Sequence, residues 1–182
     1  MRSIVDDPAC AVAHGDAPAD GTEPRRLVVV FASAVADHLL HFGRHLGYTT
    51  VLLEPAGADA SPAADLVATD VAAAGIDAAT DVVVTDHNRR ELGGVLKDVL
   101  AHPARWIGIM GSPRHPGPHG AALQHLGVPQ TEIDRVHRPI GLNIGSRTPP
   151  EIAVATLAGL LADRAGRPGG FDFDERPGPA LP

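Results

Sequence analysis

The sequence predicts a three-layer α/β fold in which helices cover both faces of a mostly parallel β-sheet. Short apolar runs rich in β-branched residues alternate with segments of helical periodicity, which is the order of elements in parallel sheets. These apolar runs are continuous, so each strand is expected to be buried on both faces. The length of 182 residues suits one domain with tails, and we find no repeat and no internal domain boundary.

The first half of the pattern contains two strands with a helix between them. The run LVVVF at residues 27–31 predicts the first strand. A helix is predicted over residues 33–46, because apolar side chains recur on one face at spacings of four, three and four. These side chains are Val35, Leu39, Phe42 and Leu46. Gly47 ends the helix, and residues 49–53 predict the second strand.

The second half continues the same alternation. Strands are predicted over residues 81–85 (DVVVT) and 105–110 (RWIGIM). Helices are predicted over residues 91–100, 121–126 and 151–164. We expect the prolines that precede residue 121 to delay the helix there.

The two ends of the sequence predict flexible segments. Residues 1–24 are rich in Ala, Asp, Gly and Pro, and residues 167–182 have a similarly loose composition. We therefore expect a flexible arm and a flexible tail on either side of a domain at residues 25–166. The one cysteine, Cys10, lies in the arm. A lone thiol excludes an internal disulfide and a cysteine-rich metal site, and it fits a reducing compartment.

Charge and hydropathy exclude two classes of partner. The formal net charge of −7 argues against a nucleic-acid-binding protein. No uninterrupted apolar run reaches the roughly 18 residues of a membrane helix. The first residues are acidic where a signal peptide needs an apolar core. We expect a cytoplasmic protein with neither a nucleic-acid nor a membrane partner.

In a parallel sheet, ligands bind beyond the carboxyl ends of the strands, so the residues that follow each predicted strand are candidates. After the first strand, Ala32-Ser33-Ala34 occupies the place of a dinucleotide-binding glycine loop but has no glycine. Ser33 could cap the helix or contact a ligand. Glu54 follows the second strand, where an acid commonly bonds a ribose hydroxyl; the alternative is a solvated acid.

Polar residues also follow the third and fourth predicted strands. Thr85, Asp86 and His87 suit either a capped turn or ligand contact with proton transfer. The segment from Gly111 to Arg114 brings a capping hydroxyl at Ser112 and a guanidinium suited to phosphate or carboxylate.

The stretch PIGLNIGSRTPPE at residues 139–151 combines a helix cap with a glycine-rich turn. Thr148 and Glu151 predict a capping box, with a proline at the first helical position. The cap does not explain the upstream residues, which are Gly141, Asn143, Gly145 and Arg147. Glycines there could let backbone N–H groups converge on an anion at the helix N-terminus, and a cap and an anion site can coexist.

Three histidines, His38, His41 and His45, share one edge of the first helix. Metal ligation is possible at this spacing. No acidic partner is interleaved, so we favour a solvated face and predict no metal site.

Several segments together resemble the xanthine dehydrogenase accessory family, also called XdhC/CoxI, in its C-terminal Rossmann-like domain. These segments are VVVTDHNRREL, WIGIMGSPRH and LGVPQTEIDRVHRPIGLNIGSRTPPEIAVATLAGLLADR. The resemblance covers roughly residues 25–166. It implies a maturation factor that holds the molybdenum cofactor (molybdopterin, with or without an attached nucleotide), supports its sulfuration and delivers it to a molybdenum hydroxylase. The client would be an enzyme of the xanthine dehydrogenase or CO dehydrogenase type.

The sequence departs from the family pattern at several points. The family usually has a Gly-Ala-Gly-type turn where this chain has Ala32-Ser33-Ala34, and often Thr-His-Asp where it has Thr85-Asp86-His87. The cysteine motif of longer members is not found. We therefore expect the Rossmann-like half alone, with a homodimer and a separate cysteine-bearing accessory subunit as further partners.

The leading hypothesis is a non-enzymatic accessory protein, with no residue assigned to catalysis. One alternative is an NAD(P)-binding oxidoreductase or regulator, against which the missing glycine loop argues. The other is a module that binds no ligand and pairs with a partner subunit. The candidate cofactor-binding residues are Ser33, Glu54, Thr85, Asp86, His87, Gly111, Ser112, Arg114, Gly141, Asn143, Gly145, Ser146, Arg147 and Thr148.

Overall fold

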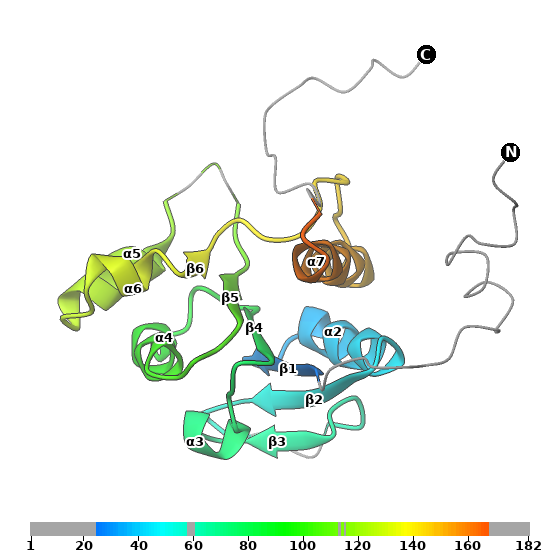
Figure 1. Cartoon of the computed structure of the whole chain (residues 1–182), viewed down its shortest axis with the longest axis horizontal. Helices are drawn as coiled ribbons and strands as arrows, with labels where there is room; N and C mark the ends of the chain where they lie inside the picture. Colours follow the sequence, from blue (N-terminus) through cyan, green and yellow to red (C-terminus); the bar gives the residue numbers. More distant parts are fainter. Residues whose placement is uncertain (1–24, 58–60, 113, 115, 168–182) are drawn as a thin grey trace, which may run out of the picture.

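The computed structural model describes residues 25–57, 61–112, 114 and 116–167. Its centre is a six-stranded sheet of order β3-β2-β1-β4-β5-β6, and every pairing is parallel (Figure 1). The predicted α/β fold with a parallel sheet is therefore confirmed. The expected arm, with Cys10, lies outside the described residues, and so does the expected tail after Arg167.

The strands and helices alternate along the chain. The strands are β1 (Arg25–Val30), β2 (Tyr48–Leu53), β3 (Leu66–Ala68), β4 (Thr80–Val84), β5 (Trp106–Ile109) and β6 (Val136–His137). The helices are α2 (Ala34–His45), α3 (Val71–Ala74), α4 (Leu92–Leu100), α5 (Pro118–His125), α6 (Gln130–Ile133) and α7 (Pro149–Arg164). Within the described part of the chain, no helix has the length and apolar character needed to cross a membrane.

Each strand and helix expected from the sequence is present, with ends shifted by a few residues. One boundary was wrong: α5 begins at Pro118, not at residue 121. Proline is tolerated there because its missing N–H and fixed φ suit the first helical turn. Four short elements were missed, namely β3, α3, α6 and β6.

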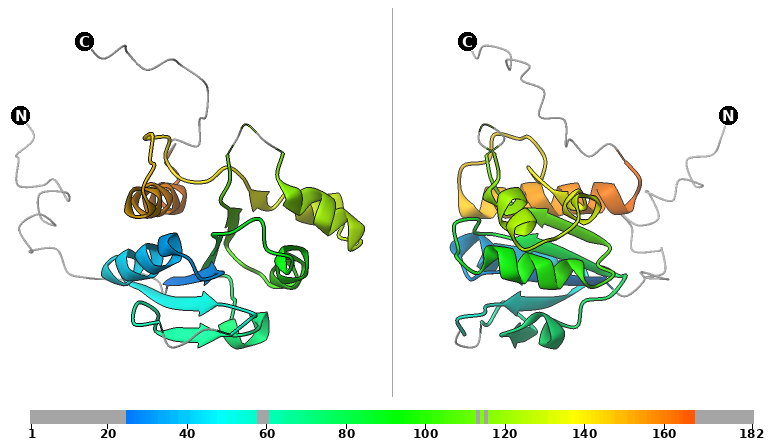
Figure 2. Two further views of the ribbon diagram at one scale, coloured as in Figure 1. Left: turned by 180° about the vertical axis from the view of Figure 1, so that it is seen from behind. Right: turned by 90° about the vertical axis from the view of Figure 1, so that its left-hand side faces the viewer.

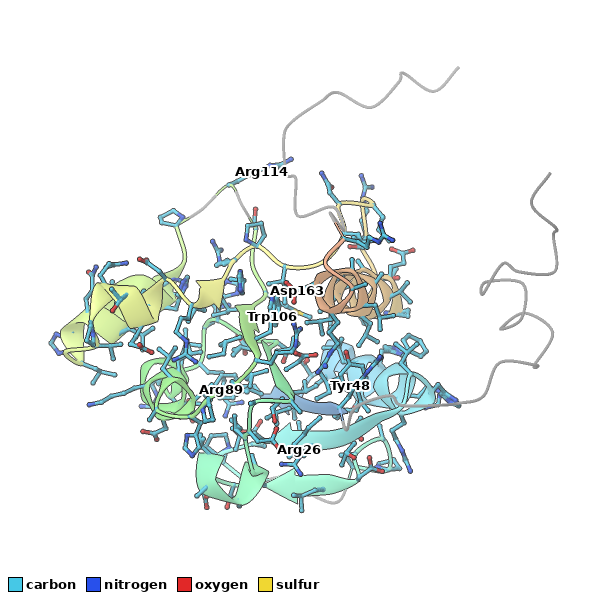
Figure 3. All side chains as sticks on the ribbon, in the orientation of Figure 1. Arg26, Tyr48, Arg89, Trp106, Arg114 and Asp163 are labelled. Atoms are coloured by element: carbon cyan, nitrogen blue, oxygen red, sulfur yellow. The ribbon has the colours of Figure 1, made fainter. Side chains whose placement is uncertain are left out.

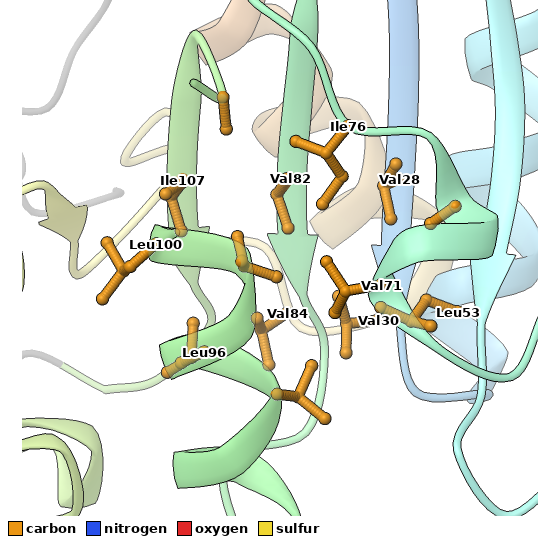
Figure 4. Packing of buried hydrophobic residues seen from close by; sticks show 14 of the residues in the cluster. Val28, Val30, Leu53, Val71, Ile76, Val82, Val84, Leu96, Leu100 and Ile107 are labelled. Carbon is orange, nitrogen blue, oxygen red and sulfur yellow. The ribbon is translucent and has the colours of Figure 1, made fainter. Parts of the chain in front are cut away.

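The core has two layers, one on each face of the sheet. Along β1, Val28 and Val30 face one layer, whereas Leu27 and Val29 face the other. Helices α3 and α4 cover the first face, where their apolar side chains meet those of the central strands (Figure 4). Helices α2 and α7 cover the opposite face (Figure 2). Both faces of β1 are thus buried, as its continuous apolar sequence predicted.

A buried ion network ties α7 to the amino-terminal edge of the sheet. The carboxylate of Asp81, which has no exposed surface, accepts hydrogen bonds from Arg105 Nε (2.6 Å), Arg164 Nε (2.9 Å) and the Tyr48 hydroxyl (3.2 Å). Arg105 also pairs with Asp163 of α7. These contacts join β2, β4, the residue preceding β5 and α7 at one point, so they fix the helix that borders the candidate site.

Candidate functional site at the carboxyl edge of the sheet

A cleft of about 450 Å³ lies beyond the carboxyl ends of the central strands. The chain runs from β1 to β2 on one side and returns to β4 on the other, so β1 and β4 flank the point where the strand order reverses. Ligands of doubly wound sheets bind at this point. The residues lining the cleft are Val35, Thr85, His87, Met110, Gly111, Ser112, Pro139, Ile140, Leu142, Asn143, Gly145, Ser146, Ile152, Ala155 and Thr156.

The structure brings together candidates from three separate loops. Those that line the cleft are Thr85, His87, Gly111, Ser112, Asn143, Gly145 and Ser146. The candidates that do not line it are Ser33, Glu54, Asp86, Arg114, Gly141, Arg147 and Thr148. The loops after β4, β5 and β6 therefore converge on one cavity, because parallel strands place their carboxyl ends at one edge.

The turn between β1 and α2 is held rigidly beside the cleft. Ser33 is the N-cap of α2, and its Oγ accepts a hydrogen bond from the Ala36 N–H (3.0 Å). The Ser33 hydroxyl donates to Thr85 Oγ1 (3.1 Å), and Thr85 donates to the carbonyl oxygen of Phe31 (2.8 Å). Thr85 Oγ1 also lies 3.1 Å from the Val30 carbonyl oxygen, so the hydroxyl of this cleft-lining residue has three hydrogen-bond partners within the protein.

Glu54 is a buried carboxylate with four hydrogen-bond donors around it. Oε2 accepts from the Ala32 N–H (2.9 Å) and Arg89 Nη1 (3.3 Å). Oε1 accepts from Arg89 Nη2 (2.7 Å) and the Ala56 N–H (3.2 Å). Burial alone would raise the pKa of Glu54, but the bonds from Arg89, Ala32 and Ala56 outweigh it and the pKa lies below the ordinary value. The sequence suggested either a solvated acid or a ribose-binding acid at Glu54, and it did not predict the ion pair with Arg89.

Two further candidates take part in local turns. Asp86 Oδ1 accepts from the Asn88 N–H (2.8 Å), which closes the turn after β4. Ser112 Oγ accepts from the Arg114 N–H (3.2 Å). Arg114 itself lies on the loop between β5 and α5 and is exposed (Figure 3).

The structure explains why residue 141 is a glycine, which the sequence alone did not. Its φ is +87°, and a Cβ built there would lie 3.1 Å from the backbone of Ala155 and Thr156 in α7. The adjacent Leu142 N–H donates to the Ala155 carbonyl oxygen (3.0 Å). The glycine thus allows the turn to lie directly against the helix. Gly145 also has a positive φ, +71°, but faces open space.

The predicted helix cap at the end of this turn is confirmed. Thr148 is the N-cap of α7, and it forms a capping box with Glu151. Glu151 Oε2 accepts hydrogen bonds from the N–H groups of both Arg147 (2.8 Å) and Thr148 (3.1 Å). These bonds hold the pKa of Glu151 below its ordinary value. Both N–H groups are therefore already hydrogen-bonded within the protein. Arg147 itself is exposed to solvent.

The cleft combines polar groups with an apolar wall. Its polar groups are the hydroxyls of four Ser and Thr residues, the Asn143 amide and the His87 imidazole. None of the residues found to line it is an Asp, Glu, Lys or Arg. Arginines follow closely on two of its loops, Arg114 after Ser112 and Arg147 after Ser146. Such a cleft can hold a flat polar ring against apolar side chains and present cations at its border.

No group of three or more metal-ligating side chains occurs among residues with a described position. On α2, the His38 ring stacks on Phe42, and the His41 ring meets the edge of His45. His41 and His45 are exposed, whereas His38 is half-buried, so the expected solvated face holds for two of the three histidines.

The residues that sequence reasoning missed are mostly apolar. They include Val35 on α2, Ile140 in the loop between β6 and α7, and Ile152 on α7, all of which line the cleft. Apolar side chains at the first turn of a helix resemble core positions in sequence, so no local signal marks them as a cleft wall. Arg89 was also missed, because its partner Glu54 lies 35 residues away.

The strand order and the cleft at the reversal point define a Rossmann-like domain with a candidate binding site. The sequence matches the family described as the XdhC Rossmann domain over residues 27–160, and the chain belongs to this family.

Two known proteins illustrate the similarity. The uncharacterized protein YqeB of Escherichia coli (strain K12) is 35% identical over 90 residues, which are 50% of this chain and 16% of YqeB. A crystal structure described as a xanthine dehydrogenase (BH1974) from Bacillus halodurans superimposes with a TM-score of 0.64 and 25% identity. That match covers 79% of this chain and 44% of the other. The chain thus spans less than half the length of each of these proteins.

Proposed function

We propose that this protein is an accessory factor of a molybdenum hydroxylase, of the xanthine dehydrogenase or CO dehydrogenase type, and that its cleft binds the molybdenum cofactor or a related phosphorylated pterin. Membership of the XdhC family and the similarity to a protein described as a xanthine dehydrogenase support the accessory role. The observation that carries the proposal for a ligand is the convergence of three polar loops on one cleft at the switch point.

The chemistry of the cleft fits such a ligand. The Ser112 hydroxyl and the Asn143 amide can donate to the ring and to oxygen atoms of a pterin. The apolar wall suits the faces of a flat ring. The guanidinium groups of Arg114 and Arg147 are available for a phosphate at the border.

The chain's own residues would hold and orient the cofactor rather than catalyse its reactions. Bound in a client enzyme, the cofactor supplies oxidation chemistry at molybdenum, so an accessory domain needs affinity, protection and release. The sequence has one cysteine, Cys10, which lies outside the described residues. The proposal therefore assigns support of sulfuration to a separate cysteine-bearing subunit. Transfer of the cofactor to the client enzyme would take place at the open side of the cleft. We further propose that the protein acts as a homodimer.

The proposal is tested by native mass spectrometry of the gently purified protein, followed by titration with molybdopterin released from a molybdoenzyme. We expect a copurified phosphorylated pterin. The His87→Ala and Arg147→Ala variants should bind about tenfold to a hundredfold more weakly, since a charge-assisted or buried polar contact contributes roughly 1.5–3 kcal/mol. His125→Ala and Arg90→Ala, which change exposed residues outside the cleft, are the matched controls. A protein that carries no pterin and binds none at millimolar concentration would refute the proposal.

A further inference from the structure

In a dinucleotide-binding Rossmann domain, the adenosine half of the ligand uses two features beside β1. The backbone of the turn after β1 approaches the pyrophosphate, and an acid at the end of β2 bonds the ribose hydroxyls. Both positions exist in this protein, as the turn around Ala32 and as Glu54. Both are already engaged with the protein itself.

The carboxylate of Glu54 has no acceptor position left for a ribose. A carboxylate offers about four lone-pair sites, and four donors surround this one at 2.7–3.3 Å. One of these donors is the Ala32 N–H, which belongs to the turn that would face the pyrophosphate. The Glu54 side chain is only 5% exposed, so an incoming hydroxyl would have to displace a bond before it could form one.

Arg89 contacts both Glu54 and Phe31 in the same region. The Arg89 guanidinium makes a two-pronged contact with Glu54 and lies over the Phe31 ring, 4.7 Å from its centre. Phe31 directly follows β1, has a φ of +71° and is fully buried. A glycine is favoured in this conformation, and here a large side chain fills the place instead. A second acid, Glu91, holds the other edge of the guanidinium at 3.4 Å.

We propose that the Glu54–Arg89 pair is a specificity device that excludes adenosine dinucleotides and confines the ligand to the part of the cleft beyond β4, β5 and β6. The lining of the cleft is consistent with this confinement of the ligand. It comes from the loops after β4, β5 and β6 and from α7, and Val35 is the one lining residue from α2. The ligand class is therefore a compact anionic molecule, such as a pterin with one phosphate. This statement of ligand class rests on the proposed function, whereas the exclusion of dinucleotides can be tested without it.

The test is a titration with NADH, followed by its fluorescence, of the wild-type protein and of Arg89→Leu. The wild type should show no saturable binding at millimolar NADH. Arg89→Leu frees the carboxylate and should gain at least about tenfold in affinity, the effect of one restored charge-assisted hydrogen bond. Arg90→Leu is the matched control, because it removes the same charge from the adjacent exposed residue and should gain nothing.

A wild-type affinity in the micromolar range would overturn the proposal, and so would a folded Arg89→Leu protein with no gain. If Arg89→Leu does not fold, the test is made on the wild-type protein by NMR spectroscopy. The backbone amide signals of Ala32 and Ala56 should then stay unchanged when ADP-ribose is added at millimolar concentration. A shift of these two signals would refute the exclusion. Failure of the proposed function has a different signature, since it would abolish pterin binding and leave the NADH results as expected.

Discussion

The buried carboxylate of Asp81 offers a sharp test of how this fold is held together. In Asp81→Asn, shape is preserved but the negative charge is lost between Arg105 and Arg164, whose side chains are 23% and 13% exposed. Removing one partner of a buried ion pair costs about 3–5 kcal/mol. The asparagine oxygen can still accept one hydrogen bond, so we expect the lower end, about 3 kcal/mol of unfolding free energy.

The assay is urea and thermal unfolding followed by circular dichroism. A loss of about 3 kcal/mol corresponds to a melting temperature lower by roughly 10 °C for a domain of this size. Asp98→Asn, an exposed acid on α4, is the control and should change stability by less than about 0.5 kcal/mol. If Asp81→Asn unfolds within about 1 kcal/mol of the wild type, the network does not stabilise the fold as argued.

Three further predictions concern titration and backbone conformation. Tyr48 is the one tyrosine of the sequence, and burial followed by the nearby Asp81 raises its pKa, so ultraviolet absorbance should show ionisation above the ordinary value of 10.0 in the folded protein and near it in denaturant. Because the folded pKa of Glu54 is lowered, the stability advantage of the wild type over Glu54→Gln should be constant above the ordinary value of 4.5 and shrink as pH falls through the folded pKa; an advantage that persists at lower pH would contradict this. Gly141→Ala should destabilise the protein more than Gly145→Ala in urea unfolding, since both residues have a positive φ but only Gly141 lies against helix backbone; equal losses would disprove the contact argument.

The larger elements of the fold could be predicted because their sequences carry strong local patterns. The run DVVVT at residues 81–85 is apolar and β-branched, and it forms most of β4. By contrast, β3 has three residues and β6 has two, which is too short for any periodicity to be visible. These strands exist because neighbouring strands pair with them, which is a tertiary effect.

The candidate site likewise has features that follow from local sequence and features that depend on contacts between distant residues. The capping box of Thr148 and Glu151 depends on residues three apart, so the sequence predicted it correctly. The role of Gly141 depends on contact with α7, and the bridge of Glu54 depends on Arg89, 35 residues away. Contacts between residues so distant in sequence leave no spacing that can be recognised in one sequence.

The hydrogen bonding around the cleft determines how an anion could be recognised there. Rossmann-like domains often hold phosphate with free N–H groups at helix N-termini. Here the Ala32 N–H bonds Glu54, and the N–H groups of Arg147 and Thr148 bond Glu151. If the proposed ligand carries a phosphate, its charge would therefore be neutralised mainly by the arginine side chains of the bordering loops, which are exposed to solvent. Exposed charges are screened over about 8 Å at physiological ionic strength, so recognition of this kind weakens as salt is added, whereas recognition by buried N–H groups changes little.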